Sequence, residues 1–287
     1  MFDIYLLEAA INGILLGGVL ALLALGCNLV FGVIDVVWIC YAELIMMGMY
    51  GMFYLVAVYH LPFVLAAVVS IVLVSVLGVL LHVIVIAPLL NAAPINQLLA
   101  TGGVLAFLQS AATVMFGIDF RNLGIRMPVI DIADMFISYA RLLAFGAALA
   151  GMVAVYLFLS RTYIGTAIRA ISQDRQIMPL MGVDSRRIYI VTSAIGGALA
   201  GLAACLLVLQ YDVHPFIGLT FGPITFMICV MGGLGNMIGG FVAAFLFAEI
   251  ISVGGFYLAS EWGYVFAFVF FILMMFIRPT GLLARRS

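Results

Sequence analysis

The chain has 287 residues, of which 67% are hydrophobic and only 8% are charged, with a formal net charge of −1 at pH 7. The mean hydropathy of +1.36 excludes a water-soluble globular protein, and a near-neutral chain without a basic stripe gives no indication of nucleic-acid binding. No Asp, Glu, Lys or Arg lies between Glu43 and Asp119, a stretch long enough for three helical spans of roughly 20 residues each. The sequence therefore predicts an all-α, polytopic membrane protein.

The first six expected spans follow the uncharged stretches of the chain. They lie at about 5–31, 43–59, 62–88, 96–117, 139–160 and 188–210. The N-terminal residues are acidic and lack the basic region of a cleaved signal peptide, so we expect the first span to be retained. Its glycines provide small faces for close helix packing.

Two polar segments set the expected orientation. Five of the eleven arginines lie within residues 161–187, against only Asp174 and Asp184. Short arginine-rich loops stay in the cytoplasm, so this segment is expected on the cytoplasmic side. Residues 117–138 lack a positive excess and are expected outside. Counting spans then places the N-terminus in the periplasm and the C-terminus, with its own arginines, in the cytoplasm.

The cytoplasmic segment has a pattern of its own. Residues 165–171 favour a short helix with Ile168 and Ile171 on one side. Asp174 can cap a second helix, which would stop at Gly182. Two interpretations stay open, namely a basic loop that only sets the topology and a docking element for a cytoplasmic partner.

A run of glycines interrupts the apolar sequence near residue 235. We expect two short helical pieces there, at about 222–231 and 237–257, because each glycine weakens a helix by roughly 1 kcal/mol relative to alanine. A last span follows at 260–277. The two pieces form either a re-entrant hairpin or two crossings, which gives about eight or nine membrane segments. Unwound backbone offers hydrogen-bonding groups to a polar solute, and the alternative is close packing of small residues.

Ionisable side chains within spans are candidates for transport chemistry. Glu43 starts the second span and Glu249 lies in an apolar run, so each has either a substrate or gating role or an interfacial position. The four cysteines lack the spacing of a metal site, and no metal site is expected. No protease or ATP-binding motif occurs, so any ATP must be bound by another chain. An ATP-driven transport subunit, an ion-coupled carrier acting through Glu43 or Glu249, and a membrane enzyme are the alternatives.

Four stretches together resemble the permease subunits of high-affinity branched-chain amino-acid ABC importers. They are FGVI (31–34) with Glu43 behind it, QLLATGG-x4-LQ (97–109), GTAIRAISQD-x6-MGVD (165–184), and VMGGLGN-x2-GG (230–240) with the closing RPTGL (278–282). Their order and spacing fit along essentially the whole chain. The resemblance implies a single transmembrane permease domain over residues 1–287, with a re-entrant element, in a bacterial inner membrane.

The resemblance also implies partners and site residues. Members of this family work as two permease chains, usually different, with two ATPase subunits and a periplasmic binding protein. The permease itself is then no enzyme and holds no cofactor, because ATP is bound by the ATPases. The 161–187 segment would rest on the ATPases through Arg169, Asp174, Met181 and Gly182. The expected solute pathway comprises Trp38, Tyr41, Glu43, Gln109, Gly232, Gly233, Gly235 and Asn236.

Two departures from the family pattern bear on substrate and coupling. The family usually has Asn-Phe-Ala-His-Gly before the glutamate, whereas residues 38–42 read Trp-Ile-Cys-Tyr-Ala. Trp38 and Tyr41 in place of an Asn and a His make this segment less polar. We therefore expect either small amino acids or more apolar, including aromatic, carboxylates as substrates. Pro179 falls within the second coupling helix, which it must kink or restart.

Overall fold

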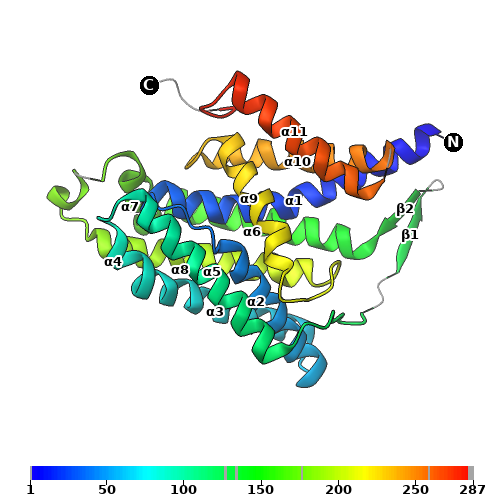
Figure 1. Cartoon of the computed structure of the whole chain (residues 1–287), viewed down its shortest axis with the longest axis horizontal. Helices are drawn as coiled ribbons and strands as arrows, with labels where there is room; N and C mark the ends of the chain where they lie inside the picture. The colour runs from blue at the N-terminus through cyan, green and yellow to red at the C-terminus, as the bar shows by residue number, and fades with distance from the viewer. Residues whose placement is uncertain (1, 126–127, 133–134, 176, 258, 284–287) are drawn as a thin grey trace.

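The computed structural model describes residues 2–125, 128–132, 135–175, 177–257 and 259–283. Most of these residues are helical, and the long helices run along the length of the molecule (Figure 1). Within the described part of the chain, seven helices are long and apolar enough to cross a membrane. Two shorter apolar helices, Ile217–Gly232 and Glu261–Ile277, accompany them. The all-α membrane fold expected from the sequence is confirmed.

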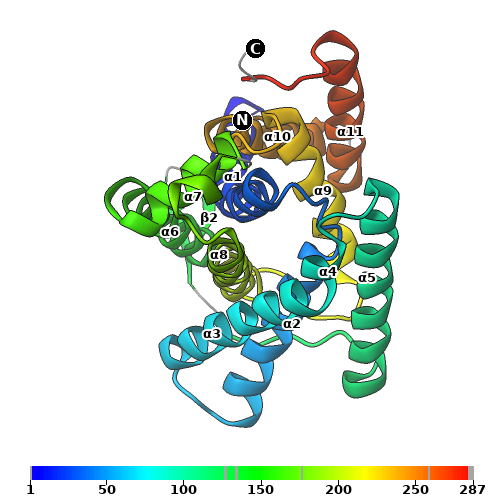
Figure 2. The ribbon, with the colours of Figure 1, turned by 90° about the vertical axis from the view of Figure 1, so that its left-hand side faces the viewer.

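Helices α1 (Phe2–Ile34) and α10 (Met237–Tyr257) form a closely packed antiparallel pair (Figure 2). The glycines of α1 permit the close approach, because a Cβ on Gly17 would press on the ring of Phe245. The Ser252 hydroxyl of α10 donates to the Ala9 carbonyl oxygen at 2.6 Å. Helix α11 (Ser260–Ile277) packs on α10, and α6 (Tyr139–Arg161) packs on α1.

A second tight contact joins α3 (Phe63–Leu81) to α8 (Ser185–Leu207). A Cβ on Gly197 would meet the backbone of α3 at Val74, so glycine is required for this approach. Helix α3 continues through a π-helical turn at His82–Ile86 into the short α4 (Ala87–Leu89). The expected spans at 62–88 and 188–210 therefore form one packed pair.

The chain between α1 and α2 (Tyr41–Phe53) is not helical, although it is enclosed by protein. Helix α1 ends at Ile34, and the next residue, Asp35, has a φ of +57° in the left-handed region. The side chains of Val36, Trp38 and Cys40 are buried. Non-helical backbone at membrane depth is tolerated only inside protein or beside a cavity, and here the Thr101 hydroxyl satisfies the Val37 carbonyl at 3.1 Å. The sequence predicted a second span without this buried, irregular lead-in.

Two ends of the molecule are distinct. One end carries α7 (Tyr163–Gln173), a 3-10 turn at Met178–Met181 and the residues that follow α11. At the other end a hairpin of β1 (Val129–Ile132) and β2 (Met135–Ser138) pairs in the antiparallel register Val129 with Ser138. This hairpin, next to the N-terminus in Figure 1, is an addition to the all-α prediction.

Helix α9 (Ile217–Gly232) begins five residues before the predicted 222–231 piece. The helix continues without interruption through Gly222 and Pro223, so that a proline lies inside it. Only the predicted start of this piece was wrong, because tertiary packing overrides the weak helix propensity of these two residues. The break at the glycines after Gly232 is confirmed. The second predicted piece, 237–257, coincides with α10. Helix α5 (Pro94–Phe116) stands at the edge of the bundle (Figure 2).

Candidate functional site

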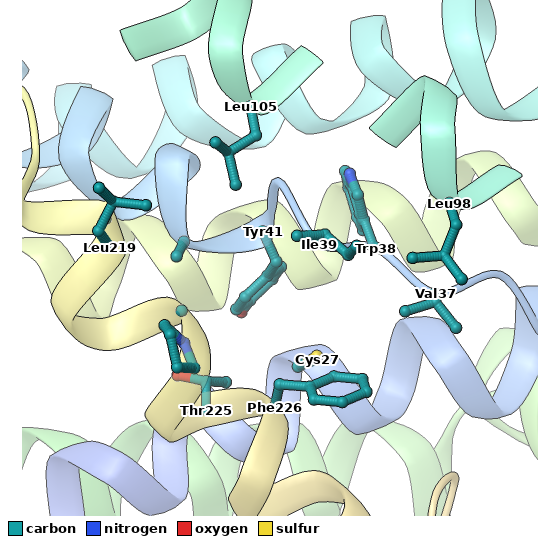
Figure 3. Close-up of a pocket in the computed structure, with 14 residues that line it drawn as sticks. Cys27, Val37, Trp38, Ile39, Tyr41, Leu98, Leu105, Leu219, Thr225 and Phe226 are labelled. Carbon is teal, nitrogen blue, oxygen red and sulfur yellow. The ribbon is translucent and has the colours of Figure 1, made fainter. Parts of the chain in front are cut away.

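A cavity of about 470 Å³ lies between α5, α9 and the irregular segment that leads into α2 (Figure 3). Its volume is within the range of small-molecule sites. Its lining residues are Cys27, Val37, Trp38, Ile39, Tyr41, Ala42, Leu98, Leu105, Gly218, Leu219, Gly222, Pro223, Thr225 and Phe226. The lining is almost wholly apolar, so the few polar groups at its edge decide what it can bind.

Trp38 and Tyr41, predicted to face the pathway, both line this cavity. Their rings meet edge to face with centroids 5.9 Å apart. The Tyr41 hydroxyl donates to the Gly196 carbonyl oxygen of α8 at 3.1 Å, which anchors the start of α2 to the bundle. Gly26 of α1 makes room for this hydroxyl, because a Cβ there would overlap it. The two aromatic rings are therefore fixed parts of the cavity wall.

Buried Glu43 and half-buried Gln109 form a hydrogen-bonded pair next to the cavity. The Gln109 amide Nε2 donates to Glu43 Oε1 at 2.9 Å and so ties α5 to α2. The Glu43 carboxyl lies against Gly218 in the first turn of α9, where a Cβ would collide with it. Its second oxygen, Oε2, is buried and has no partner among the described residues. One carboxyl group thus joins the three elements that surround the cavity.

Two polar groups on α9 were not predicted from the sequence. Thr225 is one of the lining residues, and its hydroxyl is buried without a hydrogen-bond partner among the described residues. Pro223 has no N–H, so the Leu219 carbonyl four residues earlier lacks its α-helical donor. The signal in the sequence was a proline within an apolar run, which frees a backbone acceptor wherever the helix continues through it.

The glycine run lies elsewhere. Gly232 and Gly239 are in such close contact that a Cβ on either would overlap the backbone of the other. The Gly235 N–H donates to Asn28 Oδ1 at 3.3 Å, and Asn236 Nδ2 donates to the Leu283 carbonyl at 2.9 Å. The four residues proposed for the pathway here do not line the described cavity; they are Gly232, Gly233, Gly235 and Asn236. The contacts of Gly232 favour the close-packing interpretation, whereas Gly235 lines a separate polar hollow.

Glu249 also lies away from the cavity. Its carboxyl sits against α1, close enough to Gly13 that a Cβ there would press on Oε2. It belongs to the contact between α1 and α10, not to the wall that carries Trp38 and Thr225.

The proposed coupling residues are gathered at one end of the bundle. Helix α7 is capped by Thr162, whose hydroxyl accepts the Gly165 N–H at 3.0 Å, and it buries Ile168 and Ile171 as the pattern predicted. Arg169, Asp174 and Met181 are exposed, with 74% of Met181 accessible.

The second coupling helix is shorter than predicted. Asp174 follows α7 directly, and its Oδ1 accepts the Ile177 N–H at 3.1 Å. The chain then makes only the 3-10 turn Met178–Met181 before Gly182, whose φ is +80°. Pro179 within this turn cannot donate to an α-helical ladder, which accounts for the tighter and shorter form.

An ion pair connects this end to the cavity wall. Arg175 lies 3.6 Å from the Asp35 carboxylate, and Asp35 begins the irregular segment that contributes Trp38 to the cavity. A polar hollow of about 350 Å³ lies beside the pair and is lined by Gln173 and Gly235, among others. The segment 161–187 and the cavity are thus joined through a few residues of continuous chain.

Comparisons with known proteins agree with this architecture. The family model described as "Branched-chain amino acid transport system / permease component" matches residues 9–275. The chain is 30% identical to the high-affinity branched-chain amino acid transport system permease protein BraD of Pseudomonas aeruginosa, over 97% of this chain and 96% of that protein. It is 27% identical to LivH of Escherichia coli, over 98% of this chain and 96% of LivH.

A solved structure shares the fold. PsaBC from Streptococcus pneumoniae, in complex with Fab, superposes with a TM-score of 0.54 over 94% of this chain and 91% of that chain, at 14% identity. A structural similarity at this level of sequence identity is evidence for the fold alone. The family is shown by the match of the family model over nearly the whole chain and by the identity to BraD. This chain belongs to the permease components of branched-chain amino acid transport systems.

Proposed function

We propose that this protein is the transmembrane permease subunit of an ATP-driven importer in a bacterial inner membrane. It works with a second permease chain, two cytoplasmic ATPase subunits and a periplasmic solute-binding protein. Its substrates are branched-chain or related amino acids, or small carboxylates including aromatic ones. The N-terminus lies in the periplasm, and residues 161–187 and the C-terminus lie in the cytoplasm.

The observation that carries the proposal is the placement of the cavity. A solute-sized, apolar cavity has as one wall the irregular segment after Asp35, and Asp35 pairs with Arg175 of the arginine-rich segment. A movement of that segment, driven by ATPases bound beneath it, would be passed to Trp38 and Tyr41 through the chain itself. Exposed Arg169 and Met181 offer a polar and an apolar contact to such a partner.

Reconstitution tests this proposal. The permease is co-purified with its partner permease and ATPases, placed in liposomes, and supplied with the binding protein outside and ATP inside. We expect accumulation of radiolabelled leucine, isoleucine, phenylalanine or phenylacetate that requires ATP and the ATPases. Uptake by the permease alone under a proton or sodium gradient, without ATP, would instead establish an ion-coupled carrier and contradict the proposal.

A further inference from the structure

Another polar hollow, of about 200 Å³, lies at the end of the bundle that carries the N-terminus and the hairpin (Figure 1). We propose that this hollow and the apolar groove that adjoins it bind one membrane phospholipid, with the phosphate group in the hollow and an acyl chain in the groove. The charges around the hollow select phosphatidylethanolamine, whose phosphate is followed by an ammonium group. This lipid site goes beyond the proposed function and does not depend on which solute is transported.

Helices α1, α6, α10 and α11 and the turn after α8 meet at the hollow. Its lining residues are Asn12, Leu16, Arg141, Gln210, Tyr211, Ile251, Ser252, Gly255 and Tyr264. Of these described residues Arg141 alone is charged, and its guanidinium donates to Asn12 Oδ1 at 2.8 Å. Among the described residues no carboxylate forms an ion pair with Arg141. Because a guanidinium has five N–H donors, most of them are available to an anion in the hollow.

Two tyrosines add hydrogen-bond donors to Arg141. Burial raises the pKa of the Tyr211 phenol, in the turn after α8, to about 12, and the Tyr264 phenol and the Arg141 guanidinium are near enough to influence it. The three groups therefore converge on the hollow, and the Tyr211 phenol stays protonated and can donate a hydrogen bond. A guanidinium together with neutral donors, and without a carboxylate among the lining residues, suits the oxygens of a phosphate group.

An apolar groove of about 270 Å³ continues from the hollow toward the middle of the bundle. Tyr264 lines both spaces, so the two meet at this residue. In the groove Phe268 follows Tyr264 by one turn of α11, and Phe247 precedes Ile251 of the hollow by one turn of α10. Both phenylalanines thus lie farther than the hollow from the end that carries the hairpin (Figure 1). This order, polar at the end and apolar toward the middle, is that of a phospholipid in a membrane leaflet.

Two acidic residues next to the hollow select the headgroup. Glu8 precedes Asn12 by one turn of α1, and Glu261 precedes Tyr264 by about one turn of α11, both toward the end of the bundle. Residues three or four apart share a helix face, so negative charge lies just beyond the position of the phosphate. These carboxylates favour an ammonium group that follows the phosphate, and they give no such advantage to the uncharged glycerol headgroup of phosphatidylglycerol.

Photo-crosslinking tests the site. The full-length permease, with any chains that co-purify, is mixed in dodecyl maltoside with phosphatidylethanolamine that carries a diazirine in one acyl chain, and crosslinked peptides are mapped by mass spectrometry. We expect crosslinks at the groove residues of α9 and α11. Unlabelled phosphatidylethanolamine should compete, whereas diacylglycerol, which lacks the phosphate, and inorganic phosphate, which lacks the acyl chains, should not. Phosphatidylglycerol should compete at about threefold higher concentration, the size of effect that exposed charge pairs give.

Variants locate the phosphate and the headgroup. Arg141→Gln keeps a polar side chain and removes the charge, and is expected to raise the half-saturating lipid concentration about tenfold. Tyr264→Phe removes one hydroxyl and should raise it about threefold. Arg161→Gln is the matched control and should leave it unchanged, because Arg161 is an exposed arginine at the other end of the same helix, α6. Replacing both Glu8 and Glu261 by Gln should remove the preference over phosphatidylglycerol.

An unchanged half-saturating concentration in Arg141→Gln overturns the lipid site, as does competition by diacylglycerol equal to that of phosphatidylethanolamine. Displacement by inorganic phosphate would show a site for a free anion instead, and equal competition by phosphatidylglycerol contradicts the choice of headgroup. Crosslinks that disappear when a second permease chain is bound would make the groove a subunit contact and overturn the proposal. Solute uptake is not measured, so none of these outcomes bears on the proposed function.

Discussion

Glycine positions show how finely single residues control this bundle. At Gly239 a Cβ would overlap the Gly232 backbone, whereas at Gly102 of α5 a Cβ would meet nothing within 4 Å. The two glycines therefore serve different ends, since one permits a backbone contact and the other leaves a helix surface bare.

Opposite stability changes are expected from the same substitution at these two sites. Gly239→Ala should destabilise the permease by about 1–3 kcal/mol because the backbones must separate. Gly102→Ala should stabilise it by up to about 1 kcal/mol through helix propensity. Thermal unfolding of the purified permease in detergent measures both, and a Gly239→Ala variant as stable as wild type would show that this contact can relax.

Trp38 and Tyr41 fix the shape of the cavity, so they are expected to affect which solutes pass. Asn at position 38 and His at position 41, as in the usual family pattern, are smaller and more polar than Trp and Tyr. The cavity wall therefore becomes more polar. Uptake should shift toward smaller and more hydrated solutes, with ATPase activity retained. The measurement is the relative uptake of leucine, isoleucine, phenylalanine and phenylacetate by the reconstituted complex.

A matched variant separates packing from selectivity. Tyr41→Phe removes only the hydroxyl that donates to Gly196, which should cost about 1 kcal/mol of stability and leave solute preference unchanged. If the double variant of Trp38 and Tyr41 also leaves the preference unchanged, or fails to assemble, these rings are structural.

At the scale of elements, α7 and the 3-10 turn form a compact unit with a buried inner face and an exposed outer face. Ile168 and Ile171 are fully buried, whereas Arg169 and Met181 point outward. Such a unit can move as a body, because its own caps, at Thr162 and Asp174, are internal to it.

Removing exposed polar groups from this unit should weaken coupling without unfolding the permease. Arg169→Ala and Asp174→Ala are expected to reduce solute-stimulated ATPase activity several-fold in the reconstituted complex. Arg187→Ala is the control, because Arg187 pairs locally with Asp184 at 3.0 Å near the start of α8. If both variants assemble and hydrolyse ATP as wild type does, residues 161–187 only determine the membrane orientation and do not couple ATP hydrolysis to transport.

At the scale of the whole molecule, polar segments sit at opposite ends of an apolar bundle. Arg175 lies at the end with α7, and Asn122 lies at the other end, bonded to Asp212 at 2.7 Å. The arginine excess at the first end predicts that it faces the cytoplasm.

Labelling of single cysteines tests this orientation. In a cysteine-free permease in intact cells, a membrane-impermeant maleimide should label a cysteine at position 122 and should not label one at position 175. Opening the inner membrane should expose position 175. Labelling at 175 in intact cells would reverse the orientation of the whole chain.

The sequence by itself determined the membrane class, the positions of the spans, the short helix after Thr162 and the arginine-rich end. These features follow from local properties, since hydropathy, charge and helix periodicity are read along the chain over windows of up to about 20 residues. The grouping of Trp38 and Tyr41 near Glu43 was also available, because all three lie within six residues.

Only the tertiary structure decided where the cavity lies. It is built from α9, α5 and the segment after Asp35, which are far apart in sequence, and packing alone brings Thr225 and Gly218 beside Trp38 and Glu43. The glycine run shows why two interpretations stayed open from the sequence, because glycine gives the same local pattern at an open pathway and at a close backbone contact. Whether Gly232 faces solute or Gly239 depends on what the rest of the chain places against it, and here that is backbone.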